Sequence, residues 1–522
     1  MVVATSPSTA LLYRSSRGRW VVAATVLGSA MAGIDATVVG IALPTIGRAF
    51  HAGVTELQWV SNAYTLTLAG LLLLGGSLGD RYGRRRLFQI GTAWFALASL
   101  LCGLAPDAPA LIGARALQGI GAALLTPGSL AILQASFVRD DRSKAIGAWA
   151  GLGGVATAVG PFLGGWLISA VSWRLIFYIN LPVAIAVLAV SARHVPESKD
   201  PSITGRLDVP GAALFSLALA GLTYGLTEGA SLGWGSAATL SALIGGAALL
   251  VIFCLVELTR KTPLLPLGIF RSAQFSGANA VTFVVYAGLG GALFLVPIQL
   301  QTVLGFSPFE AGISLLPITA MMLGLSARSG ALAARIGPRL QMSVGPLFVG
   351  AGLALLARVG IGTGYIPGIL PALIVLGFGL AATVAPLTAT VLGAAPSEHS
   401  GIASAVNNDV ARIASLVAVA VLPSLAGITG ESYLHPAVFS AGFHDAVLIA
   451  AGACAVGSLI AVLTIRNPTG ETKQEPPPVE WQCGLDGPTL CTSAGQLQGA
   501  APAPGGPAPG RATPALPDKR TR

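Results

Sequence analysis

The sequence predicts an all-α membrane protein that crosses the bilayer about fourteen times. Its 522 residues are 53% hydrophobic and only 10% charged, and the mean hydropathy is +0.76. A water-soluble core cannot enclose that much apolar surface. The apolar residues also fall into separate runs, each close to the roughly 20 residues that a helix needs to span a bilayer. The chain is therefore predicted to be a polytopic helical membrane protein.

The apolar runs form groups of six, two and six along the chain. The first group comprises residues 20–44, 59–78, 87–104, 110–137, 145–168 and 176–192. A close-set pair follows at residues 209–228 and 240–258. The last group comprises residues 275–300, 313–333, 342–360, 367–393, 401–427 and 445–465, with a long outside loop expected at 428–444. An even number of spans places both ends of the chain on the same side of the membrane.

These groups predict a chain of five parts. They are a cytoplasmic N-terminal segment (1–19), an N-terminal six-helix half (20–192), a linker with two extra transmembrane helices (193–274), a C-terminal six-helix half (275–465) and a cytoplasmic tail (466–522). The tail is rich in Pro, Ala and Gly, a composition that favours disorder. A twelve-span alternative would place residues 209–258 in a soluble or surface insert, but both runs are too apolar for that.

Basic residues distinguish the two sides of the membrane, because Lys and Arg accumulate in short cytoplasmic loops. The loops assigned to the cytoplasm carry most of the basic residues, whereas the outside loops hold only Arg48 and Arg174, with Arg358 near an outer helix end. This asymmetry predicts a plasma-membrane protein with both termini in the cytoplasm. Topology explains the formal net charge of +9, and nucleic-acid binding is not expected.

The short connection at residues 76–87 joins the second and third predicted spans with Gly-Ser-Leu-Gly-Asp-Arg-Tyr-Gly-Arg-Arg-Arg-Leu. It strongly resembles the signature loop between spans 2 and 3 of the major facilitator superfamily. The residues that carry the resemblance are Gly76, Asp80, Arg81, Gly83 and Arg84. The spacing recurs at residues 330–339, with Ala334 in place of Asp80, as expected of two halves related by duplication. The resemblance implies the major facilitator fold, and we expect Asp80 to latch the outward-facing state by accepting hydrogen bonds from a helix N-terminus.

Asp35 lies near the middle of the first predicted span, where an unpaired carboxylate is costly and must face a cavity or a partner. Its surroundings, residues 34–44, resemble the first-span motif of the fourteen-span drug:proton antiporter family, with Gly40 where that family usually has Asn. The resemblance implies that Asp35 is the proton-coupling carboxylate. The alternative is a carboxylate that is fixed by a buried hydrogen bond and never titrates.

Arg115 lies several residues inside the fourth predicted span, in an Arg-x-x-Gln-Gly-x-Gly pattern that resembles the family's fourth-span motif. A guanidinium is permanently charged, so it needs an anion or carbonyl groups as partners. Its field favours the ionised form of a nearby carboxylate. We therefore expect the protonation of Asp35 to depend on how close Arg115 stands in each conformation. Alternatively, Arg115 only joins helices through hydrogen bonds.

The fifth predicted span ends in a Gly-Pro-x-x-Gly-Gly pattern formed by Gly160, Pro161, Gly164 and Gly165. Small residues let helices approach closely, and Pro161 removes a backbone donor and bends the helix. The pattern resembles the antiporter motif, which implies an exporter rather than an uptake symporter. A generic small-residue packing face explains the glycines but not their combination with the proline.

Further polar residues lie in the thirteenth span and in the central pair. The thirteenth span contains Asn407, and its Asp409 is followed by Arg412 at i+3, a spacing that favours an ion pair on one helix face. This pair is a candidate for gating or for plain structural support. Glu228 and Glu257 lie at helix ends and are expected to be solvated.

The sequence has no phosphate-binding Gly-x-x-x-x-Gly-Lys-[Ser/Thr] motif, no nucleophile–base constellation and no Cys/His metal spacing. An ATP-driven pump, an enzyme and a bound cofactor or metal are therefore not expected. We predict a secondary active exporter that exchanges small hydrophobic or amphipathic compounds for protons by alternating access, with multidrug or antibiotic efflux as the role. The alternatives are a narrow exporter of one endogenous metabolite and a non-transport membrane protein such as an intramembrane enzyme. Expected partners are the substrate, protons and the bilayer, and we expect a monomer that leaves room for accessory export proteins.

Overall fold

Helices make up almost all of the described part of the chain. The computed structural model describes residues 11–199, 207–260, 263–395 and 400–467. Among these residues, fourteen helical segments are long and apolar enough to cross a membrane. The predicted all-α class and the fourteen apolar helices are confirmed, and these include both helices that the twelve-span alternative would leave outside the membrane. Residues 468–522 of the predicted tail, like residues 1–10, lie outside the described part.

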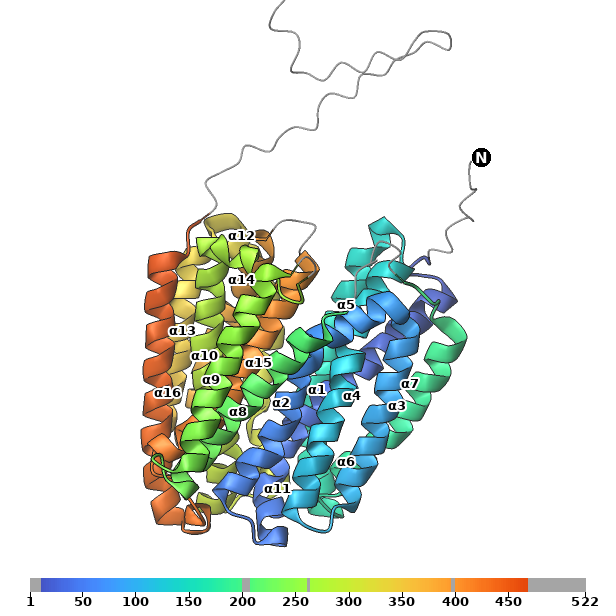
Figure 1. Ribbon diagram of the computed structural model, residues 1–522. Helices are drawn as coiled ribbons and strands as arrows, with labels where there is room; N and C mark the ends of the chain where they lie inside the picture. The colour runs from blue at the N-terminus through green and yellow to red at the C-terminus, as the bar shows by residue number, and fades with distance from the viewer. Residues whose placement is uncertain (1–10, 200–206, 261–262, 396–399, 468–522) are drawn as a thin grey trace, which may run out of the picture. The chain divides into compact units, whose positions relative to one another are not determined.

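The spans follow one another in the predicted order (Figure 1). The first six are α1 (Ser16–Phe50), α2 (Val54–Tyr82), α3 (Arg84–Leu104), α4 (Ala108–Ser136), α5 (Arg139–Ala170) and the broken helix α6 and α7 (Leu175–Tyr178 and Asn180–His194). The central pair is α8 (Val209–Leu232) and α9 (Ala237–Thr259), followed by the 3-10 turn η1 (Leu267–Arg271).

The last six spans include three that are broken or begin or end in a π-turn. They are α10 (Ala273–Ile298) with η2 (Gln299–Val303), α11 (Pro308–Ser314) with α12 (Leu316–Ile336), α13 (Pro338–Leu356), η3 (Tyr365–Ile369) with α14 (Leu370–Gly393), α15 (Ser400–Leu425) and α16 (Pro436–Thr464), with the 3-10 turn η5 (Ser432–Leu434) before the last. Because the helices alternate in direction, α1 begins and α16 ends on one side, which we call the terminal side; the opposite ends form the far side.

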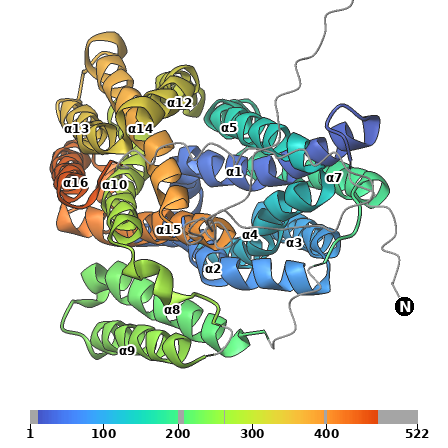
Figure 2. The ribbon, with the colours of Figure 1, turned by 90° about the horizontal axis from the view of Figure 1, so that it is seen from above.

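Two groups of helices, α1 to α7 and α10 to α16, lie next to each other, and α8 and α9 lie together beside them (Figure 2). Helix α8 packs against α2 and α15, one helix from each half. Ser216 donates to the Gly70 carbonyl at 2.9 Å, and the Trp59 indole N–H donates to Glu228 Oε1 at 2.8 Å. Glu228 is therefore bound to α2, and the prediction that it is merely solvated was wrong.

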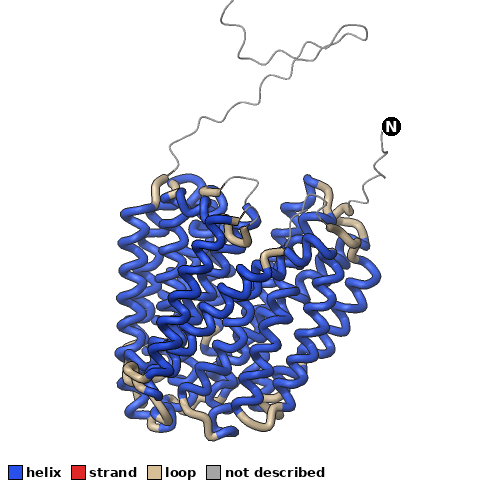
Figure 3. The backbone as a smooth tube through the Cα atoms, viewed as in Figure 1, coloured by secondary structure: helices blue, strands red, loops and turns tan. Residues whose placement is uncertain are grey.

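The hydrogen bonds that join the two halves cluster toward the far side. Gln58 Nε2 donates to the Val419 carbonyl at 2.6 Å, and Gln301 Nε2 donates to the Ile41 carbonyl at 2.8 Å. The backbone of Val54 adds a further bond to α15's far-side loop. Within the described residues, no hydrogen bond joins the halves at their terminal ends, where their traces diverge (Figure 3). Among the described residues, the hydrogen bonds between the halves therefore close the far side.

Glycines allow α5 and α11 to complete this far-side closure. A Cβ on Gly165 would lie 2.4 Å from the Pro308 carbonyl oxygen, and a Cβ on Gly312 would lie 2.2 Å from the Pro161 carbonyl oxygen. Backbone therefore touches backbone across the halves, an approach that only glycine permits. The antiporter motif of α5 is thus part of the interface between the halves.

The predicted outside loop at 428–444 is much shorter in the structure, because α16 begins at Pro436. Proline suits the first turn of a helix, and the buried Phe439 and Phe443 anchor that turn to the core. Tyr433, in the remaining loop, donates its hydroxyl to the Ala52 carbonyl at 2.8 Å. Burial raises the pKa of Tyr433, so the hydroxyl stays a neutral donor that joins the halves.

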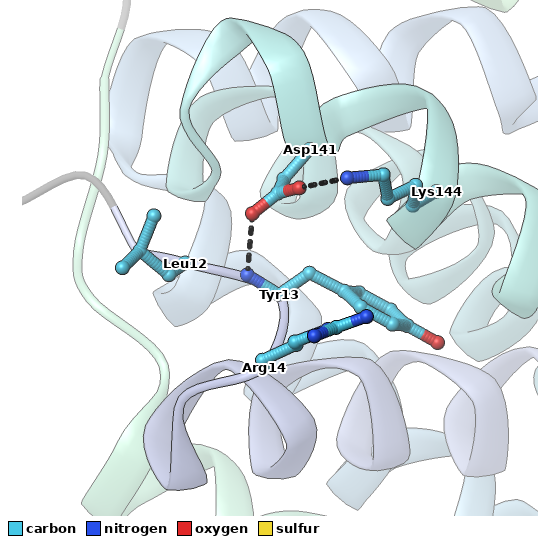
Figure 4. A pocket seen from close by; sticks show the side chains of 5 residues that line it. All are labelled: Leu12, Tyr13, Arg14, Asp141 and Lys144. Atoms are coloured by element: carbon cyan, nitrogen blue, oxygen red, sulfur yellow. Dashed lines mark hydrogen bonds and ion pairs between the residues drawn. The ribbon is translucent and has the colours of Figure 1, made fainter.

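The segment before α1 is attached to the connection between α4 and α5. Leu11 pairs with Phe137 in a single β-bridge, and the Tyr13 N–H donates to Asp141 Oδ2 at 3.0 Å. Asp141 also pairs with Lys144 at 2.8 Å, and the side chains around these contacts line a cavity of about 290 Å³ (Figure 4). The contacts fix the start of α1 on the terminal side.

We expect the hairpin between α8 and α9 to lie on the opposite membrane face from the start of α5. Gly235 is the better labelling position in this hairpin, because it is exposed while the Ser236 side chain caps α9. In a cysteine-free background, Gly235→Cys should react with an impermeant thiol reagent on intact cells. Lys144→Cys should react only after the membrane is opened. Equal reaction of both positions on intact cells would contradict the fourteen-span path.

Gly165→Val should open the far side, because its side chain would overlap the backbone of α11. Overpacking of this kind costs about 1–3 kcal/mol, enough to shift a two-state equilibrium by roughly 5- to 150-fold. Spin labels at Arg48 and Glu431, one on each half, should report a longer distance in the variant. Gly154→Val is the matched control, because nothing lies within 4 Å of a Cβ there. A distance that is equal in both variants would show that this contact does not hold the halves together.

Candidate functional site

Buried polar side chains surround Asp35 within the N-terminal half. Arg115 of α4 donates from Nη1 to Asp35 Oδ2 in a charge-assisted hydrogen bond. The other carboxylate oxygen accepts from Gln118 Nε2 at 2.8 Å and from Asn180 Nδ2 at 3.3 Å. All four side chains are buried. The structure thus brings together Asp35 and Arg115, the two residues that the sequence singled out.

Further contacts hold the Arg115 guanidinium in place. Its Nη1 donates to Gln118 Oε1 at 2.6 Å, and its Nε donates to the Val60 carbonyl at 3.2 Å. The Tyr64 ring lies against it, with its centroid 4.3 Å from the guanidinium carbon. The carboxylate of Asp35 and the guanidinium of Arg115 balance each other's charge. Removing one partner of such a buried ion pair typically costs about 3–5 kcal/mol of stability.

A serine on α3 ties the network to a break in the sixth span. Ser99 Oγ accepts from Asn180 Nδ2 at 3.0 Å and from Gln118 Nε2 at 3.3 Å, and it donates to the Phe177 carbonyl at 2.8 Å. The helix is interrupted between α6 and α7. Ser99 bonds to groups on both sides of this break, the Phe177 carbonyl of α6 and the Asn180 amide of α7, and Asn180 lies beside the carboxylate.

The polar network around Asp35 draws residues from several helices, and Asp35 is the acceptor in each of its own hydrogen bonds. Helices α1, α2, α3, α4 and α7 each contribute a residue to it, and Arg115 and Gln118 share one face of α4 because they are three residues apart. These contacts therefore tie the carboxylate of Asp35 on α1 to four other helices.

The antiporter motif also packs against the middle of α1. A Cβ on Gly160 would lie 2.3 Å from Thr37 Oγ1, and a Cβ on Gly164 would overlap the next α1 side chain. Pro161 has no N–H to offer the Thr157 carbonyl four residues earlier. Thr37 Oγ1 lies 3.5 Å from that carbonyl and partly replaces the missing donor. The segment of α5 around Pro161 therefore packs against the part of α1 next to Asp35.

The signature loop turns sharply between α2 and α3. Gly83 has a φ of +120°, a conformation that side-chain-bearing residues rarely adopt. Arg84 Nε donates to Asp80 Oδ1 at 2.7 Å, so in this conformation the carboxylate is paired within its own loop. Arg81 also has an interaction partner, and Gly76 lies against Pro127 of α4.

A glutamate after α7, rather than Asp80, caps the start of α3. Glu197 accepts from the backbone N–H of Arg85 at 3.1 Å and from that of Arg86 at 3.2 Å. The adjacent Ser198 carbonyl accepts from the Arg84 N–H at 2.9 Å. The negative charge of Glu197 lies at the positive end of the α3 helix dipole and beside three arginines, and both interactions are attractive.

The second half repeats this arrangement with an amide. Gly337 has a φ of +86° at the start of α13, and Asn467, which follows α16, accepts from the Arg339 N–H at 3.0 Å. In each half, the residue that follows the sixth helix caps the third. The match supports the duplication that the repeated glycine and arginine spacing indicated.

Helix α15 differs from the sequence-based expectation. Asn407 donates to Thr282 at 2.7 Å and to Asn279 at 3.1 Å, and so joins α15 to α10. Asp409 is 4% exposed, yet both of its oxygens, like Nε of Arg412, lack a hydrogen-bond partner among the described residues. The predicted ion pair between Asp409 and Arg412 is therefore not formed, since correct helical spacing does not oblige the two side chains to meet.

The sequence reasoning did not assign roles to Gln118, Asn180, Ser99 and Glu197. The first two had a usable signal, because an amide inside an apolar span needs partners. Ser99 and Glu197 had none, since serine is common in spans and an acidic residue in a linker is ordinarily solvated. Where the chain is described, no group of three or more His, Cys, Asp or Glu side chains could hold a metal ion.

Comparison with known proteins places this geometry in context. The protein is 35% identical over 400 residues to the tetracenomycin C resistance and export protein of Streptomyces glaucescens, covering 76% of this chain and 74% of that one. It is 35% identical over 422 residues to the multidrug resistance protein Stp of Mycobacterium tuberculosis, covering 79% and 76%.

The fold is shared with solved transporter structures. A crystal structure of a peptide transporter, POT, in complex with sulfate aligns with a TM-score of 0.64 at 15% identity, covering 87% of this chain and 96% of that one. The family model of the Major Facilitator Superfamily matches residues 25–419. With its two six-helix halves, its signature loop and this match, the chain belongs to the major facilitator superfamily.

Proposed function

We propose that the protein is a proton-coupled exporter of small hydrophobic or amphipathic compounds, with multidrug or antibiotic efflux as its role. The observation that carries the proposal is the buried carboxylate of Asp35, held by Arg115 inside the N-terminal half. The names of the relatives support efflux, since one is a resistance and export protein for an antibiotic and another a multidrug resistance protein. Membership of a transporter family speaks against the alternative of an intramembrane enzyme.

The sidedness follows from the basic residues. Arg84, Arg85, Arg86 and Lys144 lie on the terminal side, whereas Arg48 and Arg174 are among the few basic residues toward the far side. Because Lys and Arg accumulate in cytoplasmic loops, the terminal side is the cytoplasm and the membrane is the plasma membrane. The described conformation, closed on the far side, is then the inward-facing one. Substrate would enter from the cytoplasm or the inner leaflet.

Export requires the far-side contacts to open while the terminal ends close. The contacts to be broken are a few hydrogen bonds to carbonyl groups and the glycine contacts of α5 and α11. Such bonds contribute about 0.5–1.5 kcal/mol each, so binding of a substrate or a proton is sufficient to shift the balance. Asp35 would take up a proton when the movement of α1 against α5 weakens its contact with Arg115.

Two further groups have proposed parts in this cycle. In the inward-facing state, Asp80 is paired with Arg84. When the halves close on the terminal side, we expect Asp80 to exchange this partner and to latch that side, which is the role predicted for the signature loop. Asp409, buried in α15 without a hydrogen-bond partner among the described residues, is a second acid whose surroundings would change when the halves move. Asn407 supports α15 against α10.

The breadth of substrates is a separate matter. A narrow exporter of one endogenous metabolite or antibiotic shares every feature named so far, and the relatives include a protein named for one compound and a protein named for many. No bound cofactor is needed for this chemistry, and the transporter is proposed to act as a monomer, with accessory export proteins as optional partners.

Asp35→Asn should abolish proton-driven transport while leaving exchange of substrate across the membrane. The amide keeps the shape of the side chain but cannot carry a proton between the two sides. In inverted membrane vesicles with an imposed pH gradient, accumulation of ethidium or of tetracenomycin C should fall to the level of vesicles without the protein. Exchange of labelled for unlabelled compound at equal pH needs no proton movement and should persist.

The control is Asp140→Asn, an exposed carboxylate at the start of α5. It should leave both activities unchanged. If Asp35→Asn loses exchange as well as accumulation while Asp140→Asn loses neither, Asp35 has the fixed structural role instead. Uphill accumulation at the wild-type rate in Asp35→Asn would remove the proposal of proton coupling through this residue.

A further inference from the structure

Two buried carboxyl groups meet where the central helix pair joins the rest of the chain. Asp208 is the N-cap of α8, and Glu257 lies in the last turn of α9. Both lie on the terminal side, and they are only 5% and 3% exposed. The expectation from sequence that Glu257 is solvated was therefore wrong. The antiparallel path of α8 and α9 brings the two groups together although they are far apart in sequence.

Each carboxyl group has one satisfied and one unsatisfied oxygen. Asp208 Oδ1 accepts from the Gly211 N–H at 2.9 Å and lies 3.1 Å from Arg260 Nη1, while Glu257 Oε2 accepts from the Leu265 N–H at 2.8 Å. The remaining oxygens, Asp208 Oδ2 and Glu257 Oε1, have no donor among the described residues.

These two unsatisfied oxygens lie close together beside Gly211. A Cβ added there would lie 2.5 Å from Asp208 Oδ2 and 2.8 Å from Glu257 Oε1, so the same small volume holds both oxygens and no described donor. Ionised carboxylates only accept hydrogen bonds, so this contact is favourable only if one group carries a proton. Two like charges in contact in a buried site cannot both ionise cheaply.

We propose that Asp208 and Glu257 form a proton-binding site, in which one shared proton clips the start of α8 to the end of α9. Arg260 balances one of the two negative charges, and the proton balances the other. A metal ion fits less well, because hard cations such as Ca²⁺ take six to eight oxygen ligands and this site offers two free ones. The site is separate from Asp35 and needs no part of the proposed transport cycle.

Among the described residues, few other charges lie near the two carboxyl groups. The elements packed against α8 and α9 are α2, α15 and η1. Their charged residues toward this side are Asp80, Arg81, Asp409, Arg412 and Arg271. Asp80 pairs with Arg84, and in the described part of the chain no ion pair joins Asp409, Arg412 or Arg271 to Asp208 or Glu257.

The position of the site suggests its consequence. Residue 208 ends the connection from the N-terminal half, and the segment bound by Glu257 at Leu265 leads into α10 of the C-terminal half. The shared proton therefore joins the two connections through which the central pair is attached. When the pH on the terminal side rises and the proton is lost, the two like charges separate and the clip opens.

Infrared spectroscopy of the full-length protein in lipid nanodiscs tests the site directly. The difference spectrum between wild-type protein and Glu257→Gln should contain a protonated carboxyl band that is lost as the pH rises, because the amide of the variant donates permanently to Asp208. Any band from the other buried acid, Asp409, is common to both proteins and cancels in the difference. Glu228→Gln is the matched control on the same helix pair, since both oxygens of Glu228 already have donors, Trp59 and Ser231, and it should leave the band in place.

Thermal unfolding provides a second readout that does not depend on the band. The clip is complete at low pH and is lost as the pH rises, so the Tm of wild-type protein should fall relative to that of Glu257→Gln as the pH is raised. Asp208→Asn serves if Glu257→Gln does not fold. A protonated carboxyl band of equal intensity in wild-type protein and in both variants, or a Tm that rises with added Ca²⁺ or Na⁺ at constant pH in wild-type protein only, would overturn the proton site.

Discussion

The buried pair of Asp35 and Arg115 constrains the N-terminal half more than any other interaction. Two full charges deep in a membrane protein are tolerated only if they meet each other and satisfy their remaining donors and acceptors. The chain meets this requirement with Gln118, Asn180 and the Val60 carbonyl, drawn from α4, α7 and α2. The break between α6 and α7 and the close approach of α5 to α1 can both be understood as consequences, because each puts a polar group or a backbone where the pair needs it.

The interface between the halves follows a different rule. Far-side contacts are made by side-chain amides and a tyrosine hydroxyl bonding to backbone carbonyls, and by glycines that let backbones touch. Neutral hydrogen bonds and contacts between small residues are individually weak. They also bring no charge to the interface that would have to be desolvated each time the interface closes. Such an interface can open and close, whereas an interface of the same size made of ion pairs would resist opening. The charges are instead kept within a half, where they need not separate from their partners entirely.

Much of this structure was predictable, and the failures have physical causes. Runs of apolar residues specified fourteen spans, and the repeated glycine and arginine spacing specified two related halves. The contact of Asp35 with Arg115 followed from the cost of burying either alone. The prediction failed where burial depended on a distant segment, as for Glu257, which is covered by the start of α8. It also failed for the pairing of Asp409 with Arg412, because helical spacing fixes which face a side chain leaves from but not which way it turns.

The two halves treat their buried acids differently, and this difference gives the proposed cycle a direction. In the described conformation, Asp35 accepts hydrogen bonds from Arg115, Gln118 and Asn180. Asp409 has no hydrogen-bond partner among the described residues, although leaving a buried polar group unpaired is costly. In the proposed cycle, a movement that weakens the contact with Arg115 would bring Asp35 closer to the situation of Asp409, and would so couple a change of proton occupancy to a change of exposed side. Arg412, whose Nε also lacks a partner among the described residues, lies one turn from Asp409 and would become its partner if α15 turned. The coupling thus needs no long-range pathway, only helices that pass between two sets of neighbours.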